Sequence, residues 1–250
     1  MIGAARSAAQ QQMVSRNAGY MAIGIESFHD NFQTLPPGGT KTDKGELLHG
    51  WAIFMAPFLA FGSESIDYAI PWNRPPNAEL YKCNVGMFVN QSLGGPYFDD
   101  QGFGLSHFAG NQHVLPIRTV NFEKPKPTEG YRHHLPMQEL GKMNQAMNMS
   151  QITDGTSNTL LLGTVSERFK PWGHPANIRD PSLGIDRSPD GFGGPPSWTG
   201  AVFSFCDGHT ALINRKIDPR VLRQLATPSG GEPPVTDGAI KPQPKPDFGW

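Results

Sequence analysis

The longest regular pattern of apolar and polar positions lies in the first 32 residues. Apolar residues return there at intervals of four and three, at Val14, Ala18, Met21, Ile25, Phe28 and Phe32. This spacing places them in one stripe along a helix. Residues 4–12 contain good helix formers but almost no large apolar groups, so we expect them to project or to pack loosely. The Pro36-Pro37 pair ends the pattern, which predicts a helical stem over residues 1–34.

Short strand-like runs follow in the second half of the chain. Residues 159–165, 201–206 and 209–213 favour strands, and the last two form a predicted hairpin about Asp207-Gly208. A short helix is expected from Pro219 to Leu225, with Asp218 as its N-cap. One long helix followed by strands indicates an α+β fold.

The middle of the chain has a less regular pattern. Residues 51–59 are strongly apolar, and periodicity does not decide between a short helix and a buried segment. Residues 71–145 are dense in Pro, Gly and Asn, which predicts long surface loops. The expected organisation is a stem (1–34), a body (35–232) with a loop-rich insertion at 71–145, and a Pro/Gly-rich tail (233–250) to which we assign no structure.

Composition and charge narrow the classes of partner. The 250 residues include 21 basic and 22 acidic residues, a net charge of −1, so we predict no nucleic-acid partner and no electrostatic attraction to an anionic membrane. No window reaches the ~18 apolar residues needed to span a bilayer, and no signal peptide is present. We therefore expect the chain as given to be soluble. The two cysteines, Cys83 and Cys206, could form a disulfide or remain two buried thiols.

Several groups of residues, in a fixed order, resemble one family. They are Ala4-Ala5-Arg6, Asn17, Phe28-His29-Asp30, Leu35-Pro36-Pro37-Gly38, Tyr81-Lys82-Cys83, Ile152 to Leu162, Pro171-Trp172, Phe205 to Gly208 and Leu225-Ala226-Thr227. These groups are similar to those of the DUF1559 family, bacterial prepilin-like proteins abundant in planctomycetes that also carry a solute-binding label. The resemblance covers essentially residues 4–232.

The resemblance implies a type IV pilin-like fold, in which a long N-terminal helix packs on an antiparallel β-sheet with long loop insertions. It also implies a cell-envelope or extracellular protein that assembles with itself or with other pilin-like subunits. In that family a prepilin cleavage site and a membrane helix precede the Ala-rich segment, and the sequence shows neither before Gly3. We expect membrane contact only through such a missing helix. Met1 then begins either a truncated form or a natural form without that helix.

This chain departs from the family pattern at three positions. Ser197 stands ten residues before Asp207, where many members have a histidine, so a role tied to that histidine does not transfer. The cysteine usual in the stem is missing around Val14-Ser15, and Cys206 stands where small residues are common. The family's stem-to-body cysteine pairing is therefore not carried over.

One acidic turn offers candidate metal ligands. Asp154, Thr156 and Asn158 place side-chain oxygens at alternate positions, as in the first half of a calcium loop. The twelfth position, which would need a bidentate glutamate, is Val165. The alternative is that Asp154-Gly155 forms a turn whose polar side chains cap backbone groups before a strand. Calcium is thus a possible ligand, and no other cofactor is expected.

The remaining candidates point to binding rather than to chemistry. Four aromatic residues lie among Gly- and Pro-rich loops and could line a ligand groove or fill a core under the loops: Trp72, Tyr97, Phe103 and Trp172. No nucleophile, zinc or phosphate-binding motif is present, and Asp207 is explained by its turn, so we expect no enzyme activity. The leading hypothesis is a structural, assembly or surface-display role. The alternative is a module that binds a glycan, a peptide or calcium through the 71–145 loops.

Overall fold

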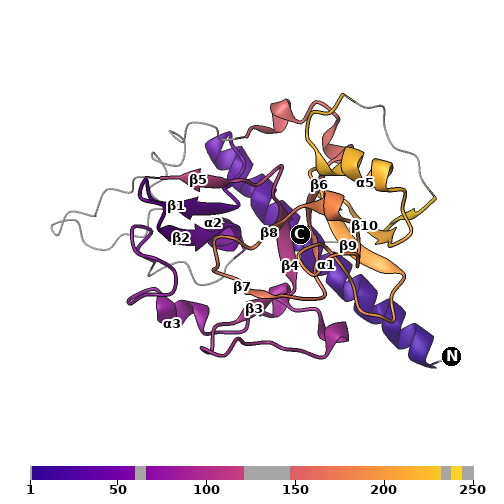
Figure 1. Cartoon of the computed structure of the whole chain (residues 1–250), viewed down its shortest axis with the longest axis horizontal. Helices are drawn as coiled ribbons and strands as arrows, with labels where there is room; N and C mark the ends of the chain where they lie inside the picture. Colours follow the sequence, from indigo (N-terminus) through magenta and orange to yellow (C-terminus); the bar gives the residue numbers. More distant parts are fainter. Residues whose placement is uncertain (1, 60–65, 121–146, 232–237, 244–250) are drawn as a thin grey trace.

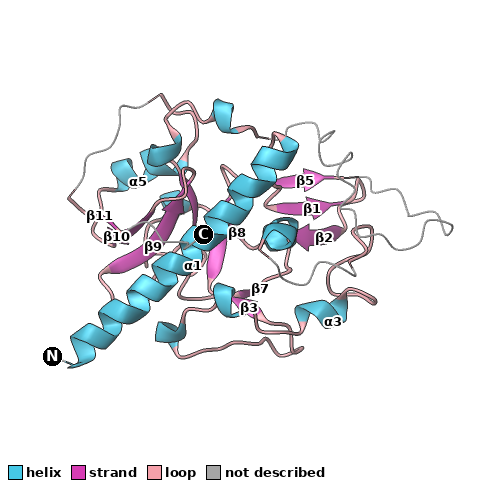
Figure 2. Cartoon of the chain, turned by 180° about the vertical axis from the view of Figure 1, so that it is seen from behind, coloured by secondary structure: helices cyan, strands magenta, loops and turns pink. Residues whose placement is uncertain are grey.

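A long helix crosses a mixed sheet in the computed structural model, which describes residues 2–59, 66–120, 147–231 and 238–243 (Figure 1). The helix, α1 (Ile2–Phe32), lies on one face of a six-stranded sheet and extends beyond the body at its N-terminal end (Figure 2). The fold therefore belongs to the mixed α+β class, as the sequence predicts.

The central sheet is mostly antiparallel. Its strand order is β11 (Ile240–Pro242), β10 (Thr210–Asn214), β9 (Gly200–Phe205), β6 (Leu160–Thr164), β4 (Phe108–Asn111) and β8 (Ile178–Arg179). Neighbouring strands run antiparallel except β4 and β8, which are parallel. The three strand signals in the second half of the sequence thus form the middle of this sheet.

Both faces of the central sheet are apolar. Along β9, Val202 joins the core under α1, whereas Phe203 and Phe205 belong to a second cluster on the opposite face. This alternation follows from the two-residue period of a strand. Leu222 and Leu225 of α5 (Pro219–Ala226) complete the second cluster. The sheet is therefore sandwiched between α1 and α5.

The predicted turn and cap are confirmed. The β9–β10 hairpin turns at Gly208, which has a φ of +82°, and the carboxylate of Asp207 accepts a hydrogen bond from the amide of His209. The positive φ favours glycine because it has no Cβ. The carboxylate of Asp218 accepts a hydrogen bond from the amide of Arg220 and caps α5, with Pro219 as its first residue.

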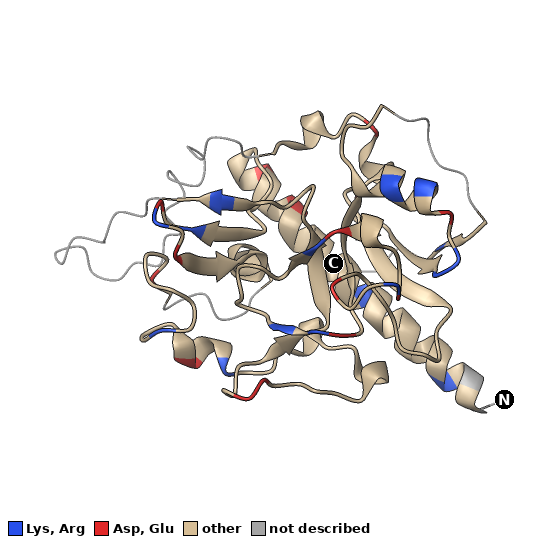
Figure 3. Ribbon diagram, in the orientation of Figure 1, with Lys and Arg blue, Asp and Glu red and all other residues tan. Residues whose placement is uncertain are grey.

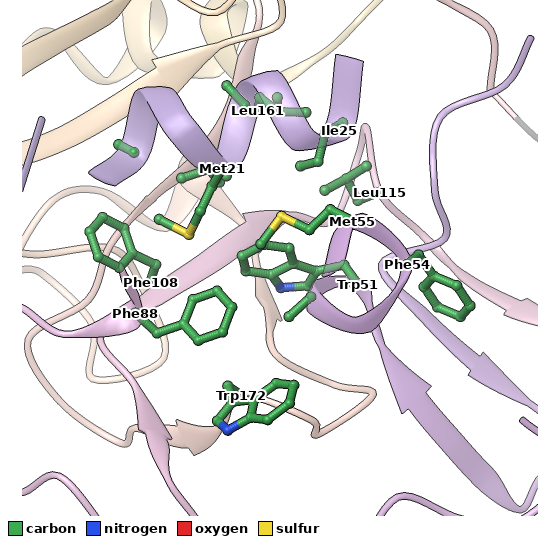
Figure 4. Close-up of a cluster of buried hydrophobic side chains, with 14 of the residues drawn as sticks. Met21, Ile25, Trp51, Phe54, Met55, Phe88, Phe108, Leu115, Leu161 and Trp172 are labelled. Atoms are coloured by element: carbon green, nitrogen blue, oxygen red, sulfur yellow. The ribbon is translucent and has the colours of Figure 1, made fainter. Parts of the chain in front are cut away.

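The stripe along α1 is buried against the protein's own sheet. Met21, Ile25 and Phe28 are fully buried, and α1 packs on β6, β9 and β10. Figure 4 shows Met21 and Ile25 above Trp51, with Phe108 of β4 beside them. A helical stripe can contact its own sheet or a neighbouring subunit. In residues 14–32 the stripe contacts its own sheet.

The apolar run at 51–59 is helical rather than extended. It begins with α2 (Trp51–Met55), whose five residues are all buried, and continues into a 3-10 turn, η1 (Ala56–Phe58). Pro57 fits near the start of this turn because its missing amide donor has no partner there. The helix places Trp51 and Phe54 under α1 (Figure 4).

The prediction of surface loops throughout 71–145 is wrong for part of the segment. Residues 108–111 form β4, a fully buried strand inside the central sheet, and two more strands, β3 (Leu105–Ser106) and β5 (Ile117–Thr119), lie close by in the chain. The β4 sequence Phe-Ala-Gly-Asn has no alternating pattern because both of its faces are covered. Residues 121–146 lie outside the described part of the chain.

Two small sheets and several short helices complete the body. The first sheet has the order β2 (Leu47–Gly50), β1 (Gly39–Lys41) and β5, with β1 parallel to β5, and the second pairs β3 with β7 (Lys170–Pro171). The remaining short helices are α3 (Ala78–Tyr81), η2 (Gly86–Phe88), η3 (Gln91–Leu93), η4 (Met149–Gln151), η5 (Thr156–Asn158) and η6 (Pro181–Leu183).

Candidate functional site

The projecting end of α1, residues 3–13, is the most distinctive exposed feature of the described chain. Val14 is the first buried residue of the apolar stripe, and Met13 directly before it is 45% exposed. Ala5, Ala8, Ala9 and Gln12 are also exposed. At 1.5 Å per residue this end is about 16 Å long. The expectation that the first turns project is confirmed (Figure 2).

The projecting end is rich in alanine and glutamine and nearly uncharged. Arg6 is the single charged residue among residues 2–13, and the first turn holds no acidic group. Figure 3 shows charged residues of both signs scattered over the body, but only basic residues on this end of the helix. Alanine and serine side chains let a second helix approach the backbone closely. This surface can therefore take part in helix–helix contact.

The other end of α1 is fixed to the body by polar contacts as well as by its stripe. The ring of Phe28 packs edge-on against Phe32, Phe54 and Phe58, with ring centroids 4.6 to 6.5 Å apart. Just after the helix, the amide of Leu35 and the hydroxyl of Thr34 donate to the carbonyl of Met147, at 2.7 and 3.1 Å. A rigid connection thus holds the projecting end at a defined angle to the sheet.

The acidic turn at 154 acts as a backbone cap in the structure. The carboxylate of Asp154 accepts hydrogen bonds from the amides of Gly230 and Gly231, at 2.6 and 2.8 Å. The side-chain amide of Asn158 donates through Nδ2 to the carbonyl of Asp154 at 2.9 Å, and Thr156 begins η5. Both carboxylate oxygens that calcium would need are therefore used to hold the 228–231 segment. These contacts favour the turn interpretation over a calcium site.

Three of the four candidate aromatic residues come together, but they are buried. The ring of Trp72 lies 4.7 Å from Phe103 and 5.9 Å from Tyr81, and Tyr81 lies 4.4 Å from Trp172. Trp172 is only 1% exposed. Tyr97 stands apart from them, 5.9 Å from the ring of His107. The cluster fits a core under the loops better than an open groove.

Histidines inside the body serve as neutral hydrogen-bonding groups. Burial lowers the pKa of His49 to about 4, and its Nδ1 lies 2.9 Å from the hydroxyl of Tyr81. His107 accepts from the amide of Asn90 through Nδ1 and contacts the carbonyl of Pro96 through Nε2. These positions explain the two rings by packing and hydrogen bonding.

Two His–Asp pairs lie nearer the surface. At the β9–β10 turn, Nδ1 of His209 is 2.5 Å from Asp207, and the ring stacks on Phe205. At the carboxyl ends of β4 and β8, Nε2 of His113 is 3.0 Å from Asp180, which also caps η6 through the amide of Ser182. No described group of three or more His, Cys, Asp or Glu residues has an arrangement that could hold a metal ion. Each pair therefore has a structural explanation: Asp207 and His209 lie in one hairpin turn, and Asp180 caps η6.

Buried arginines are the polar groups that sequence patterns miss. Arg179, only 6% exposed, donates from its guanidinium to the carbonyls of Glu167, Arg168, Pro189 and Gly191. Arg118 on β5 is 5% exposed. Neither residue lies in a motif. Both lie at strand positions, and a charged residue where an apolar one would be expected is the signal that the sequence offers.

The cysteines and Ser197 take no part in a shared site. Cys83 and Cys206 are both free thiols, Cys83 exposed and Cys206 buried. Burial raises the pKa of Cys206 well above its ordinary value. Ser197 is exposed, in the segment before β9.

Comparison with known proteins identifies the family. The chain matches the model of the family described as a protein of unknown function, DUF1559 (SBP_bac_10), over residues 3–168. This chain belongs to the DUF1559 family. The match covers all of α1 from Gly3 and the chain through β6, which confirms the resemblance inferred from the sequence. No curated protein and no solved structure matches this DUF1559 protein. Among its described helices, none has both the length and the apolar character required to cross a bilayer.

Proposed function

We propose that this DUF1559 protein is a non-enzymatic, type IV pilin-like structural subunit, which assembles through the projecting end of α1. The observation that carries the proposal is the division of α1 into two parts. The apolar stripe from Val14 to Phe28 is buried against the sheet, whereas the helix before it extends from the body with Ala5, Ala8, Ala9 and Gln12 exposed. A rigid helix presented in this way is suited to packing beside the same helix of another subunit.

The character of the body supports a structural role. Nδ1 of His49 lies beside the hydroxyl of Tyr81, His107 accepts from the amide of Asn90, and Asp154 accepts from two backbone amides. The aromatic loop residues of the body are packed on each other. We therefore propose that the body is a display or spacer unit, and that the protein acts at the cell envelope, as the family resemblance implies.

Cysteine cross-linking tests the proposal. In a Cys83→Ser background, which leaves only the buried Cys206, Ala9→Cys places a thiol on the projecting end and Thr199→Cys places one on the body. With a bismaleimide added to the cells that make the protein, Ala9→Cys should give dimers and higher oligomers. Thr199→Cys is the matched exposed control and should remain monomeric.

Charge provides a second test. Glutamate at Ala5, Ala8 and Gln12 keeps helix propensity but places three like charges on the projecting end, so it should abolish the oligomers. Glutamate at Asn73, Gln101 and Thr199 should leave them intact. The proposal fails if Ala9→Cys gives no oligomers in cells, or if both glutamate triplets have the same effect.

A further inference from the structure

Arg118 is a buried cation to which the described residues supply no hydrogen-bond partner. It lies in the middle of β5, the edge strand of the β2-β1-β5 sheet, and only 5% of it is exposed. Its Nε, Nη1 and Nη2 are all buried, and none of them has a hydrogen-bond partner in the part of the chain that the structure describes. Its neighbour on β1 is Thr40. The hydroxyl of Thr40 already lies within hydrogen-bond distance of both the amide and the carbonyl of His49.

Two other arginines show how this chain supplies acceptors to a sheltered guanidinium, although Nε of Arg215 has none among the described residues. Arg179 reaches four backbone carbonyls, and Arg215 donates to the carbonyl of Trp198 at 2.8 Å and lies 3.0 Å from Asp186. Both thus have acceptors that the chain itself supplies. Arg118 differs from them because no acceptor and no ion-pair partner is found for it among the described residues.

An unpaired buried charge is costly, so it calls for an explanation. Lysine or histidine in such a place could lose its proton, but arginine remains charged at neutral pH. Burial lowers the pKa of Arg118 only to about 10, which leaves it protonated. A negatively charged acceptor beside this group offsets part of the free energy lost on burying it.

We propose that Arg118 binds a small oxyanion, a carboxylate or a phosphate, at the edge of the β2-β1-β5 sheet. The planar guanidinium presents five N–H donors in a fork that matches two oxygens of either group. Apolar ligands and cations would leave its donors unsatisfied. Arg118 lies outside the central sheet, on an edge strand of the β2-β1-β5 sheet. This binding role is independent of the proposed assembly through α1.

Thermal unfolding of the full chain in a buffer free of phosphate and carboxylate tests the proposal. Sodium phosphate and sodium acetate are titrated separately, and sodium chloride at the same ionic strength is the control. Because a ligand that binds only the folded state stabilises it by mass action, at least one oxyanion should raise the melting temperature in a saturable way. The arm that responds distinguishes phosphate from carboxylate. Chloride should give no saturable rise.

Variants connect the response to Arg118. Arg118→Met should lose the saturable rise, and without added anion it should melt no lower than the wild type, because it removes an unpaired charge. Arg118→Lys keeps the charge but not the fork, and should bind at least tenfold more weakly. Arg179→Lys, the matched buried control, should melt lower but keep the response, as should the glutamate triplet on α1.

A nuclear magnetic resonance measurement gives a direct readout. The Nε–H signal of Arg118, assigned by its loss in Arg118→Lys, should shift when the responding anion is added. The proposal is overturned if neither oxyanion gives a saturable rise, if Arg118→Met keeps the rise, or if the Nε–H signal does not move at saturating anion.

Discussion

Replacing Arg179 by methionine should destabilise the protein more than any exposed charge substitution. The guanidinium donates through Nη1 to the carbonyls of Pro189 and Gly191, at 2.8 and 2.5 Å, and through Nη2 to those of Glu167 and Arg168, at 2.6 and 2.9 Å. It thereby ties two loops, 167–168 and 189–191, to the end of β8. Methionine fills a similar volume but leaves all four carbonyls without this donor.

The magnitude follows from the number and burial of these bonds. A hydrogen bond to a charged group contributes about 1.5–3 kcal/mol, but four that share one group are not additive. Removing one side of a buried charged network typically costs about 3–5 kcal/mol, and we expect Arg179→Met to fall in this range. For a protein of this size the melting temperature should fall by roughly 10 °C. Arg179→Lys, with three donors on a flexible stem, should recover only part of the loss.

Urea unfolding and hydrogen exchange measure the effect. Arg168→Met is the matched control, because Arg168 pairs with Asp190 at the surface and both side chains are 62% exposed; such a pair contributes about 1 kcal/mol or less. Exchange should accelerate in 167–168 and 189–191 for Arg179→Met only. If the free energy of unfolding of Arg179→Met lies within about 1 kcal/mol of the wild-type value, Arg179 does not hold the two loops in the way described.

Three further substitutions test other parts of the structure. Asp154→Asn should lower the free energy of unfolding by about 1–3 kcal/mol, because it weakens the hydrogen bonds to the amides of Gly230 and Gly231. Calcium should leave the melting temperature of the wild type unchanged. A melting temperature that rises with calcium in the wild type but not in Asp154→Asn would contradict the turn interpretation. The pKa of His49 is about 4 when folded and about 6.5 when unfolded, so the unfolded chain binds the extra proton and stability falls as the pH drops through this window. His49→Phe should remove about 3 kcal/mol of that fall, measured by urea unfolding between pH 7 and 4. If the dependence of the unfolding free energy on pH is unchanged in this variant, His49 is not its source. Phe28→Ala should cost about 3–5 kcal/mol and Met13→Ala, at an exposed position, less than about 0.5 kcal/mol in the same assay; similar losses would mean that α1 is not fixed as described.

Sequence patterns predict the parts of the fold in which local and tertiary preferences agree. The stripe from Val14 to Phe32 has the period of a helix and is buried as one face. The β9–β10 hairpin has a turn residue that its backbone requires. By contrast, β4 is four residues long and covered on both faces, so it has neither the length nor the alternation by which a strand is recognised.

The polar network of the body could not be predicted because its partners are distant in the chain. Asp154 meets Gly230 across 76 residues, and Arg179 meets backbone carbonyls, which carry no sequence signal. The aromatic candidates were found by type, yet only the fold shows that Trp72 packs on Phe103 and that Tyr81 joins Trp72 to Trp172. Residue type thus predicts that a group needs a partner, and topology decides which one.

The position of α1 also has a consequence for the order of events during synthesis. The helix is made first, but it packs on β9 and β10, which begin at Gly200 and Thr210. At a ribosomal rate of about 5–20 residues per second, its apolar stripe waits roughly 10–40 s for its sheet. A helix of this length can form early, but such distant contacts close slowly. A nascent chain interrupted before β9 would therefore display an apolar helix that only earlier elements such as α2 and β6 can cover in part. Holdase chaperones bind such a form, and it aggregates in their absence.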